Sequence, residues 1–245
     1  MKDQAYASCH AQASRCYGCG VPFCQTGSES DGKPFGCPLK NLIPEWNAML
    51  AGGNVEEAVR RLLKTNCFPE ITGRVCPAFC QQVCIHRETD KKPVQNRATE
   101  LFLAEYAFAN GMITAERPAL RSGNALAIIG SGPMGLAAAH YLSARGHDVT
   151  VYEKEAAPGG GLLTKISRKK LPESVINRRL SLLEAQGVQF ITNETVDAEA
   201  LQGRYDLVVD CAAEKANPFI ASALAAGKQA AVDAECALLG YTNLL

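Results

Sequence analysis

The sequence predicts a chain of two domains, a helical cysteine-rich domain over residues 1–118 and a parallel α/β domain over residues 119–245. Nine of the 11 cysteines fall within the first 84 residues. Buried-strand patterns that alternate with helices begin only after Asn124, and such alternation is typical of a parallel sheet. Between Thr114 and Asn124 the periodicity gives way to polar residues and a proline, which marks the boundary.

The composition excludes several classes of protein. The chain of 245 residues is 47% hydrophobic and 20% charged, as expected of a globular protein with a sizeable core. No apolar run is long enough to cross a bilayer, and residues 1–4 carry no apolar signal, so we expect a cytoplasmic protein without membrane contacts. Basic and acidic residues are balanced at 25 each, which does not support a nucleic-acid partner.

Two helices are predicted in the first domain. Asn54 precedes an apolar stripe over residues 55–63, and Glu57 at the third helical position completes a variant of the capping box. The second helix covers about residues 98–110 and stops at Gly111, a residue suited to the left-handed conformation after a helix. The remainder of this domain is rich in cysteine, proline and short turns.

The second domain alternates between strands and helices. Strands are expected at residues 125–129, 148–152, 188–192 and 205–209. Helices are expected from the glycine-rich turn after the first strand to Arg145, over residues 172–186, and from Asn217, as N-cap, to about Leu239. This order predicts a parallel sheet covered by helices.

The cysteines form two closely spaced groups. They are Cys16-x2-Cys19-x4-Cys24 with Cys37 beyond, and Cys76-x3-Cys80-x3-Cys84. Thiolates at these spacings can converge on one inorganic centre, and a cubane iron–sulfur cluster takes four ligands. Seven cysteines are one short of two such clusters. A zinc ribbon would favour two CxxC knuckles, whereas the second group is spaced by three. The spacing favours iron–sulfur ligation over zinc or structural thiols.

Three ordered segments carry a resemblance to a known family. They are RCYGCGVPFC at residues 15–24, GCPLKNLIPEWN at residues 36–47 and TNCFPEITGRVCPA at residues 65–78. Over about residues 10–105 the chain resembles the iron–sulfur domain at the front of the glutamate synthase small subunit. Relatives are the N-terminal part of dihydropyrimidine dehydrogenase and the large subunit of transhydrogenases that couple NADH, ferredoxin and NADPH. The resemblance implies a helical domain with two [4Fe–4S] clusters.

The resemblance also implies the ligands of each cluster. Carried over by position, one cluster is held by Cys16, Cys19, Cys24 and Cys84, and the other by Cys37, Cys76, Cys80 and Glu100. Glu100 lies seven residues after Pro93 and stands for the missing eighth cysteine. Without the resemblance, Glu100 is more simply interpreted as a solvated carboxylate near the start of a helix. Cys9 and Cys67 lie outside the pattern and are expected to be ordinary buried thiols.

A glycine-rich turn opens the second domain. Gly130, Gly132 and Gly135 form a GxGxxG motif after a predicted strand, and Glu153 follows Gly135 by 18 residues. In a Rossmann fold these glycines permit the tight turn, the approach of a pyrophosphate to the helix N-terminus and close helix–strand packing, and the acid binds a ribose hydroxyl. The motif predicts a dinucleotide site.

The resemblance extends into this domain, where the family binds FAD. It implies further contacts from Pro133, Met134, Lys154, Gly160, Gly161, Leu162, Lys170, Val196 and Glu214. The family inserts a second Rossmann domain for NADPH after the strand that corresponds to residues 205–209. This chain passes directly to its last helix and has no second glycine-rich fingerprint. We therefore expect a truncated Rossmann-like FAD domain with no NAD(P)H site of its own.

Two segments near the expected isoalloxazine side depart from the family. Its Gly-Ile-Pro is replaced by Ile166-Ser167-Arg168 in a segment one residue shorter, and its Ala-Thr-Gly-Ala turn is replaced by residues 211–214. The same region carries a run of basic residues, namely Lys165, Arg168, Lys169, Lys170, Arg178 and Arg179. This run is expected either to dock an acidic partner or a phosphate, or to be a solvated face.

These features predict an electron-transfer subunit and assign no catalytic residue. Hydride transfer needs a nicotinamide stacked on a flavin, and neither motif offers a substrate pocket or an acid–base pair. We expect two [4Fe–4S] clusters and FAD to relay electrons to or from protein subunits of a hydrogenase, formate dehydrogenase, transhydrogenase or bifurcating complex. The alternatives are a self-contained small NAD(P)H-dependent reductase and a non-catalytic scaffold that bears clusters.

Overall fold

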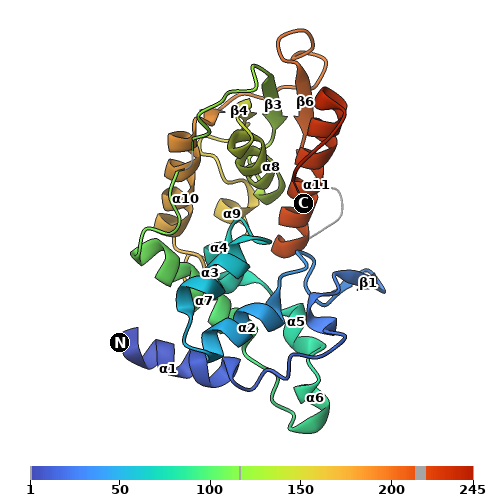
Figure 1. Cartoon of the computed structure of the whole chain (residues 1–245). Coiled ribbons are helices and arrows are strands. Elements are labelled where there is room, and N and C mark those ends of the chain that lie inside the picture. The colour runs from blue at the N-terminus through green and yellow to red at the C-terminus, as the bar shows by residue number, and fades with distance from the viewer. Residues whose placement is uncertain (1, 116, 213–218, 245) are drawn as a thin grey trace. The chain divides into compact units, whose positions relative to one another are not determined.

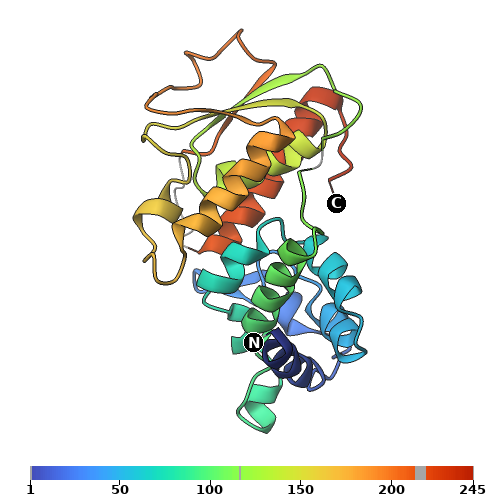
Figure 2. The same cartoon turned by 90° about the vertical axis from the view of Figure 1, so that its left-hand side faces the viewer.

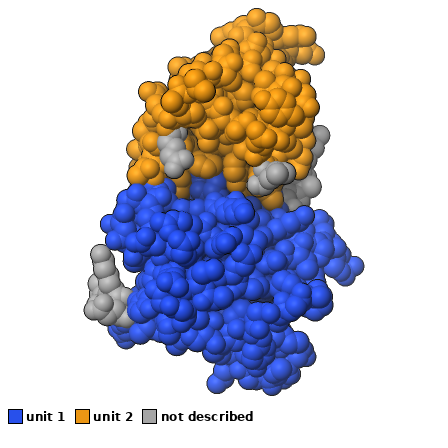
Figure 3. Space-filling view, in the orientation of Figure 1, with its two compact units in different colours: residues 1–113, 219–222 blue, residues 114–218, 223–245 orange. Residues whose placement is uncertain are grey.

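The computed structural model describes residues 2–115, 117–212 and 219–244. The chain divides into two compact units, which are coloured separately in Figure 3. Unit 1 is Met1–Ile113 with Phe219–Ser222, and unit 2 is Thr114–Pro218 with Ala223–Leu245.

Unit 1 is mainly helical (Figure 1). Its elements are α1 (Lys2–Ala13), η1 (Phe23–Gln25), β1 (Ser28–Ser30), β2 (Lys33–Phe35), α2 (Ile43–Ala51), α3 (Val55–Leu63), α4 (Pro69–Val75), α5 (Phe79–Gln82), α6 (His86–Thr89) and α7 (Asn96–Ala109). The two predicted helices are confirmed as α3 and α7, and α7 begins two residues earlier than expected.

Three longer helices of unit 1 have no clear sequence pattern. Helices α2 and α4 carry a proline in their first turn, which the sequence alone equally favours as a turn residue. Among the described side chains of α1, Cys9 and Ala13 are buried and the others are wholly or partly exposed, so α1 lacks a continuous apolar stripe.

The predicted capping box of α3 is wrong. Asn54 is the residue before the helix, but its side chain makes no capping hydrogen bond. Glu57 instead forms an ion pair with Arg60 three residues along the exposed face of α3. Glu57 therefore pairs with the Arg60 guanidinium and not with the backbone at the start of α3.

The core of unit 1 forms around α7, which packs against α1, α3 and α4. Trp46, Leu50, Phe68 and Leu103 have no exposed surface. Burial of each of these side chains contributes about 1.5–3 kcal/mol to folding. Most cysteines of unit 1 lie in the loops and short helices that join these packed helices, so the core fixes where the thiols lie.

Unit 2 contains a parallel sheet and its connecting helices. Its elements are β3 (Ala125–Ile129), α8 (Pro133–Ala144), β4 (Asp148–Tyr152), α9 (Gly161–Thr164), α10 (Glu173–Gln186), β5 (Gln189–Ile191), β6 (Leu207–Asp210) and α11 (Ile220–Leu239). The predicted bounds of β3 and β4 are confirmed. Strand β6 begins two residues later and ends one residue later than predicted. The predicted N-cap Asn217 lies outside the described residues.

The sheet has the strand order β5-β4-β3-β6, and all neighbouring strands are parallel. Leu126 of β3 is in register with Val149 on one side and Leu207 on the other. The first strand, β3, lies inside the sheet. The chain adds β4 and β5 on one side of β3 and then returns to add β6 on the other side, so the order of addition reverses at β3, as in a Rossmann fold. The prediction of a parallel α/β domain is confirmed.

The two faces of the sheet are covered differently. Figure 2 shows α8, α10 and α11 side by side. Ala127 and Ile129 point in the direction opposite to their neighbours in β3 and pack in a cluster with Leu201 and Val196, which lie in the segment between β5 and β6. An irregular segment therefore covers the sheet surface that these residues form.

Two glycines allow the turn between β3 and α8. Gly130 has φ of +92°, a conformation that strains other residues. At Gly135, an added Cβ would lie 1.9 Å from the carbonyl oxygen of Gly130, so the helix could not approach the strand as closely. Gly130 and Gly135 are therefore required by the fold itself.

Among the helices of the described residues, none is long and apolar enough to span a membrane.

The close contact at Gly135 predicts a large loss of stability on substitution. We expect Gly135→Ala to lower the free energy of unfolding by about 3 kcal/mol, because the new methyl group overlaps the backbone of Gly130. Gly52→Ala is the matched control, since a Cβ there would lie at an ordinary 3.5 Å from its neighbours. Urea denaturation followed by circular dichroism measures both, and equal effects would contradict the packing argument.

Candidate functional sites

Four thiols of unit 1 line a common pocket. Cys16 and Cys19 follow α1, Cys24 lies in η1, and Cys84 follows α5. Burial, and to a smaller extent the charges of the nearby Cys16, Cys84 and Cys19 thiolates, raise the pKa of the Cys24 thiol to about 12. The structure thus brings together the first predicted ligand set.

The second predicted set also lies around one pocket. Cys37, Cys76, Cys80 and Glu100 line it. Burial raises the pKa of Cys37 to about 12 and that of Cys76 to about 11, and in both the charge of Glu100 acts in the same direction. The pKa of Cys80 is raised well above its ordinary value, chiefly by burial and then by Cys37. When ionised, these groups are close enough to repel one another.

Glu100 is not a solvated carboxylate. It lies in the second turn of α7 and only 8% of its surface is exposed. The Thr72 hydroxyl of α4 donates a hydrogen bond to Oε1 of Glu100, and Asn66 Nδ2 donates to the same oxygen at 3.4 Å. Burial raises the pKa of Glu100 to about 7 despite these hydrogen bonds. Because both donors reach Oε1, they fix the carboxyl group with Oε2 left for another ligand.

The chemistry of the donor sets limits what they can hold. Buried thiolates and a buried carboxylate are unfavourable unless a cation compensates them. A tetrahedral zinc ion with bonds of about 2.3 Å would require the four sulfurs to lie about 3.8 Å apart. Within the described residues, no group of three or more histidine, cysteine or acidic side chains converges on a single ion. The four donors of each set line one pocket.

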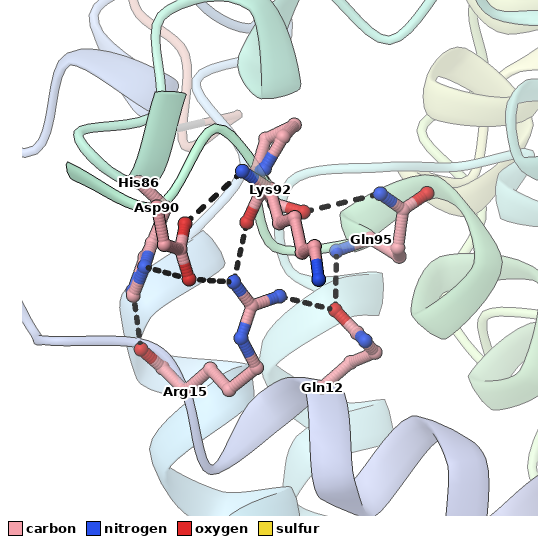
Figure 4. A network of polar contacts seen from close by, with 7 residues as sticks. Gln12, Arg15, His86, Asp90, Lys92 and Gln95 are labelled. Carbon is pink, nitrogen blue, oxygen red and sulfur yellow. Dashed lines mark hydrogen bonds and ion pairs between the residues drawn. The ribbon is translucent and has the colours of Figure 1, made fainter. Parts of the chain in front are cut away.

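A network of polar contacts holds the segment before Cys16 (Figure 4). The Arg15 guanidinium donates to Asp90 Oδ2 at 2.7 Å and to Gln12 Oε1 at 3.1 Å. The backbone N–H of Lys92, together with Arg15, holds the pKa of Asp90 below its usual range, so this carboxylate remains charged. The network therefore ties the end of α1 to the loop after α6.

His86 extends this network to the other side of the pocket. Its Nε2 lies 2.7 Å from the backbone oxygen of Arg15, and the Tyr17 ring stacks on it with centroids 4.2 Å apart. Arg15 precedes Cys16, and His86 follows Cys84 by two residues. These contacts therefore join the segment that carries Cys16 to the segment that carries Cys84. Tyr17 and His86 themselves line the pocket beside the thiols.

Unit 2 contains a pocket of about 320 Å³ at the carboxyl ends of β3 and β4. A ligand site is expected at this edge, where the strand order reverses. Seven of the predicted cofactor residues line the pocket, namely Gly130, Gly132, Glu153, Lys154, Gly160, Gly161 and Val196. Gly132 is also the N-cap of α8, so the positive end of that helix faces the pocket wall.

Other predicted cofactor residues lie elsewhere. Pro133, Met134 and Gly135 form the first turn of α8, and Leu162 is buried behind the wall. Lys170 is exposed and is not among the residues that line the pocket. Glu214 lies outside the described residues.

Glu153 organises the rim of the pocket through Ser131. Its Oε2 accepts a hydrogen bond from the Ser131 N–H at 3.1 Å and another from the Ser131 hydroxyl, and its Oε1 accepts one from the Glu155 N–H at 3.0 Å. Burial opposes ionisation, but these hydrogen bonds outweigh it and lower the pKa of Glu153. Ser131 Oγ also accepts from the Gly159 N–H at 2.8 Å. The glycine-rich turn, the end of β4 and the 159–161 loop are thereby held together.

Several residues of the sites have no sequence signal that identifies them. Thr164 and Glu194 line the dinucleotide pocket but belong to no motif or run that the sequence singles out. Thr72 lies inside the segment that carries the family resemblance, yet its hydroxyl acquires a role only because α4 packs on α7. Tertiary contacts, and not spacing, select these residues.

The chain is similar to known iron–sulfur oxidoreductases. Residues 2–112 match the family described as dihydropyrimidine dehydrogenase domain II, 4Fe-4S cluster, and residues 128–186 match the NAD(P)-binding Rossmann-like domain family. The glutamate synthase [NADPH] small chain of Bacillus subtilis is 43% identical over 82% of this chain and 41% of its own length. That of Mycobacterium tuberculosis is 40% identical over 82% of this chain and 40% of its own length.

A third relative has a broader description. The putative oxidoreductase AegA of Escherichia coli is 35% identical over 80% of this chain and 29% of its own length. The chain thus spans well under half the length of each of these three relatives. The resemblance to glutamate synthase small chains is confirmed, together with the presence of a 4Fe-4S domain and a Rossmann-like domain.

The two ligand sets predict separable losses of iron. We expect Cys24→Ser and Cys80→Ser each to lower the iron content from about eight to about four atoms per chain, because each removes one thiolate from a different four-ligand set. Iron and acid-labile sulfide are counted after anaerobic reconstitution of the full chain. Cys67→Ser, which changes a buried thiol outside both pockets, is the control. Equal iron loss in all three variants would contradict the assignment.

The hydrogen bond from Thr72 to Glu100 predicts an effect on one centre alone. Thr72→Val keeps the side-chain shape and removes the donor. A hydrogen bond to an anionic ligand favours the reduced state, so we expect the reduction potential of the centre in the Glu100 set to fall by about 50 mV at unchanged iron content.

Thr99→Val is the matched control, because the Thr99 side chain is also buried in unit 1 but its hydroxyl donates to the backbone oxygen of Gln95. Potentiometric titration followed by electron paramagnetic resonance measures both variants. A potential that stays the same in Thr72→Val, or that shifts equally in Thr99→Val, would contradict a role for Thr72 at Glu100.

Proposed function

Because the chain is homologous to glutamate synthase small chains over about four-fifths of its length, we propose that it is an electron-transfer subunit of a larger oxidoreductase. The observation that carries this proposal is the presence, in one chain, of two four-donor pockets and a dinucleotide pocket. A chain that carries two sets of metal donors and a dinucleotide site is suited to moving electrons between partners.

The cofactors of the proposal are two [4Fe–4S] clusters and FAD. When bound, the clusters would supply one-electron transfer and the flavin would join one-electron to two-electron chemistry. Cys16, Cys19, Cys24 and Cys84 would hold one cluster, and Cys37, Cys76, Cys80 and Glu100 the other. The protein's own contribution is to bury these donors, to orient Glu100 through Thr72, and to hold the FAD pocket open through Ser131 and Glu153.

The proposal places the terminal substrate chemistry on partner subunits. Residues 211–219 join β6 to α11, at the point where the family resemblance implies an inserted NADPH domain. A segment of this length has no room for such a domain. We propose that other protein subunits, of the hydrogenase, formate dehydrogenase, transhydrogenase or bifurcating type, supply or accept the electrons.

A second candidate function is favoured by one specific observation. Residues 128–186 match a family described as NAD(P)-binding, and the end of β4 carries an acidic residue of the kind that binds a ribose hydroxyl. In this alternative the pocket around Glu153 holds a nicotinamide dinucleotide, and the chain is a small reductase.

Anaerobic purification of the full chain followed by reductive titration separates these functions. We expect about eight irons and about one FAD per chain, with bleaching of both chromophores by dithionite and no reduction by NADPH or NADH alone. Acid extraction identifies the released nucleotide, and a metal analysis counts iron and zinc.

Three outcomes would contradict the proposal. Rapid reduction of the isolated chain by a nicotinamide nucleotide, without flavin, would establish the small reductase. Iron without any flavin would leave a cluster-bearing scaffold. Zinc in place of iron would remove the electron-transfer function altogether.

A further inference from the structure

Lys165 lies at the dinucleotide pocket, where contacts with Gly161 fix its position. Its backbone N–H donates to the carbonyl oxygen of Gly161 at 2.9 Å, which closes the turn at the end of α9. Its side chain extends over the same glycine, since a Cβ built on Gly161 would lie 3.5 Å from Lys165 Cδ. The aliphatic stem is therefore packed along the wall, and Lys165 is one of the residues that line the pocket.

The glycine under Lys165 adjoins the turn that opens α8. Gly160 precedes Gly161, and a Cβ built on Gly160 would lie 3.0 Å from the Cα of Gly132. Gly132 is the N-cap of α8. The N-terminus of this helix is where the pyrophosphate of a dinucleotide lies in a Rossmann fold. Lys165 is thus placed next to the expected position of the phosphates.

The charges along the pocket wall make a cation at this position necessary. Among the lining residues, Glu153, Glu155 and Glu194 are acidic, and Lys154 and Lys165 are basic. An anionic dinucleotide is repelled by this excess of carboxylates unless a cation faces its phosphates. Glu153 is already bound by backbone N–H groups and by Ser131, so it offers Lys165 no competing partner there.

Lys154 and Lys170 are less suited to this role. Lys154 directly follows β4 and Glu153, which places it on the ribose side of the pocket. Lys165 and Lys170 are both exposed, but Lys170, which the family resemblance implies, does not line the pocket, whereas Lys165 does. Lys165 directly precedes the Ile166-Ser167-Arg168 segment, where this chain departs from the family.

We propose that Lys165 pairs with the pyrophosphate of the dinucleotide and is a determinant of its affinity in this chain. The inference rests on the proposed flavin site and adds a residue that the family pattern does not assign. It requires no redox step, because the ammonium group only binds and orients the phosphates.

Binding of FAD to the full chain tests the role of Lys165. The flavin is removed and FAD is titrated back while flavin fluorescence is followed at two ionic strengths. We expect Lys165→Met to weaken FAD binding about ten-fold or more and to reduce the loss of affinity between low and high salt. Lys165→Arg is expected to restore most of the affinity, because it returns the positive charge.

The controls distinguish the proposal from a general effect of charge. Lys169→Met changes an exposed lysine of the same segment and is expected to bind FAD like the unmodified chain. Iron content and melting temperature of each variant report whether the chain is folded. A smaller loss in Lys165→Met than in Lys170→Met or Lys169→Met would overturn the proposal, as would a failure of Lys165→Arg to restore affinity. If the unmodified chain binds no flavin, the proposed function itself fails.

Discussion

The structure depends first on the burial of thiols and a carboxyl group around two pockets. The ionised forms of these groups repel one another. The thiols of Cys24, Cys37 and Cys80 and the carboxyl group of Glu100 all have raised pKa values, mainly because burial disfavours their charged forms. Such an arrangement is unfavourable in isolation and becomes favourable when a cationic centre compensates the charges. The packing of α7 on its neighbouring helices holds the donors in place. Metal binding and folding of unit 1 are therefore expected to be coupled.

The pocket of unit 2 differs from those of unit 1 because its expected ligand is an anion. The glycine-rich turn directs the N-terminus of α8 at the pocket, and the contacts of Ser131 with Glu153 and Gly159 fix three loops before any ligand arrives. Because the polar groups of the rim already bond one another, little ordering remains for binding. The pocket is pre-organised by hydrogen bonds, whereas the donor pockets of unit 1 are held mainly by helix packing.

The sequence predicts best where local patterning and burial agree. Strands β3 and β4 follow from short buried runs bounded by glycine and polar residues, and their predicted bounds are confirmed. Glu100 is the opposite case, because its position near a helix start favours solvent, and only the contacts from Thr72 and Asn66 reveal a buried carboxyl group. Lys165 is similar, since it stands in a basic run that is equally typical of a solvated face. Long-range packing determines the surroundings of both Glu100 and Lys165, and spacing along the chain does not contain that information.

The most direct test of the central claim is the location of the metal in crystals of the full chain grown without oxygen. Diffraction data collected on both sides of the iron absorption edge give the iron positions independently of any atomic coordinates. We expect two separate groups of iron atoms in unit 1, one bonded to Cys24 and its set and one bonded to both Cys80 and an oxygen of Glu100. A single metal site, a signal at the zinc edge, or a Glu100 carboxyl group turned away from the metal would contradict the assignment of two clusters.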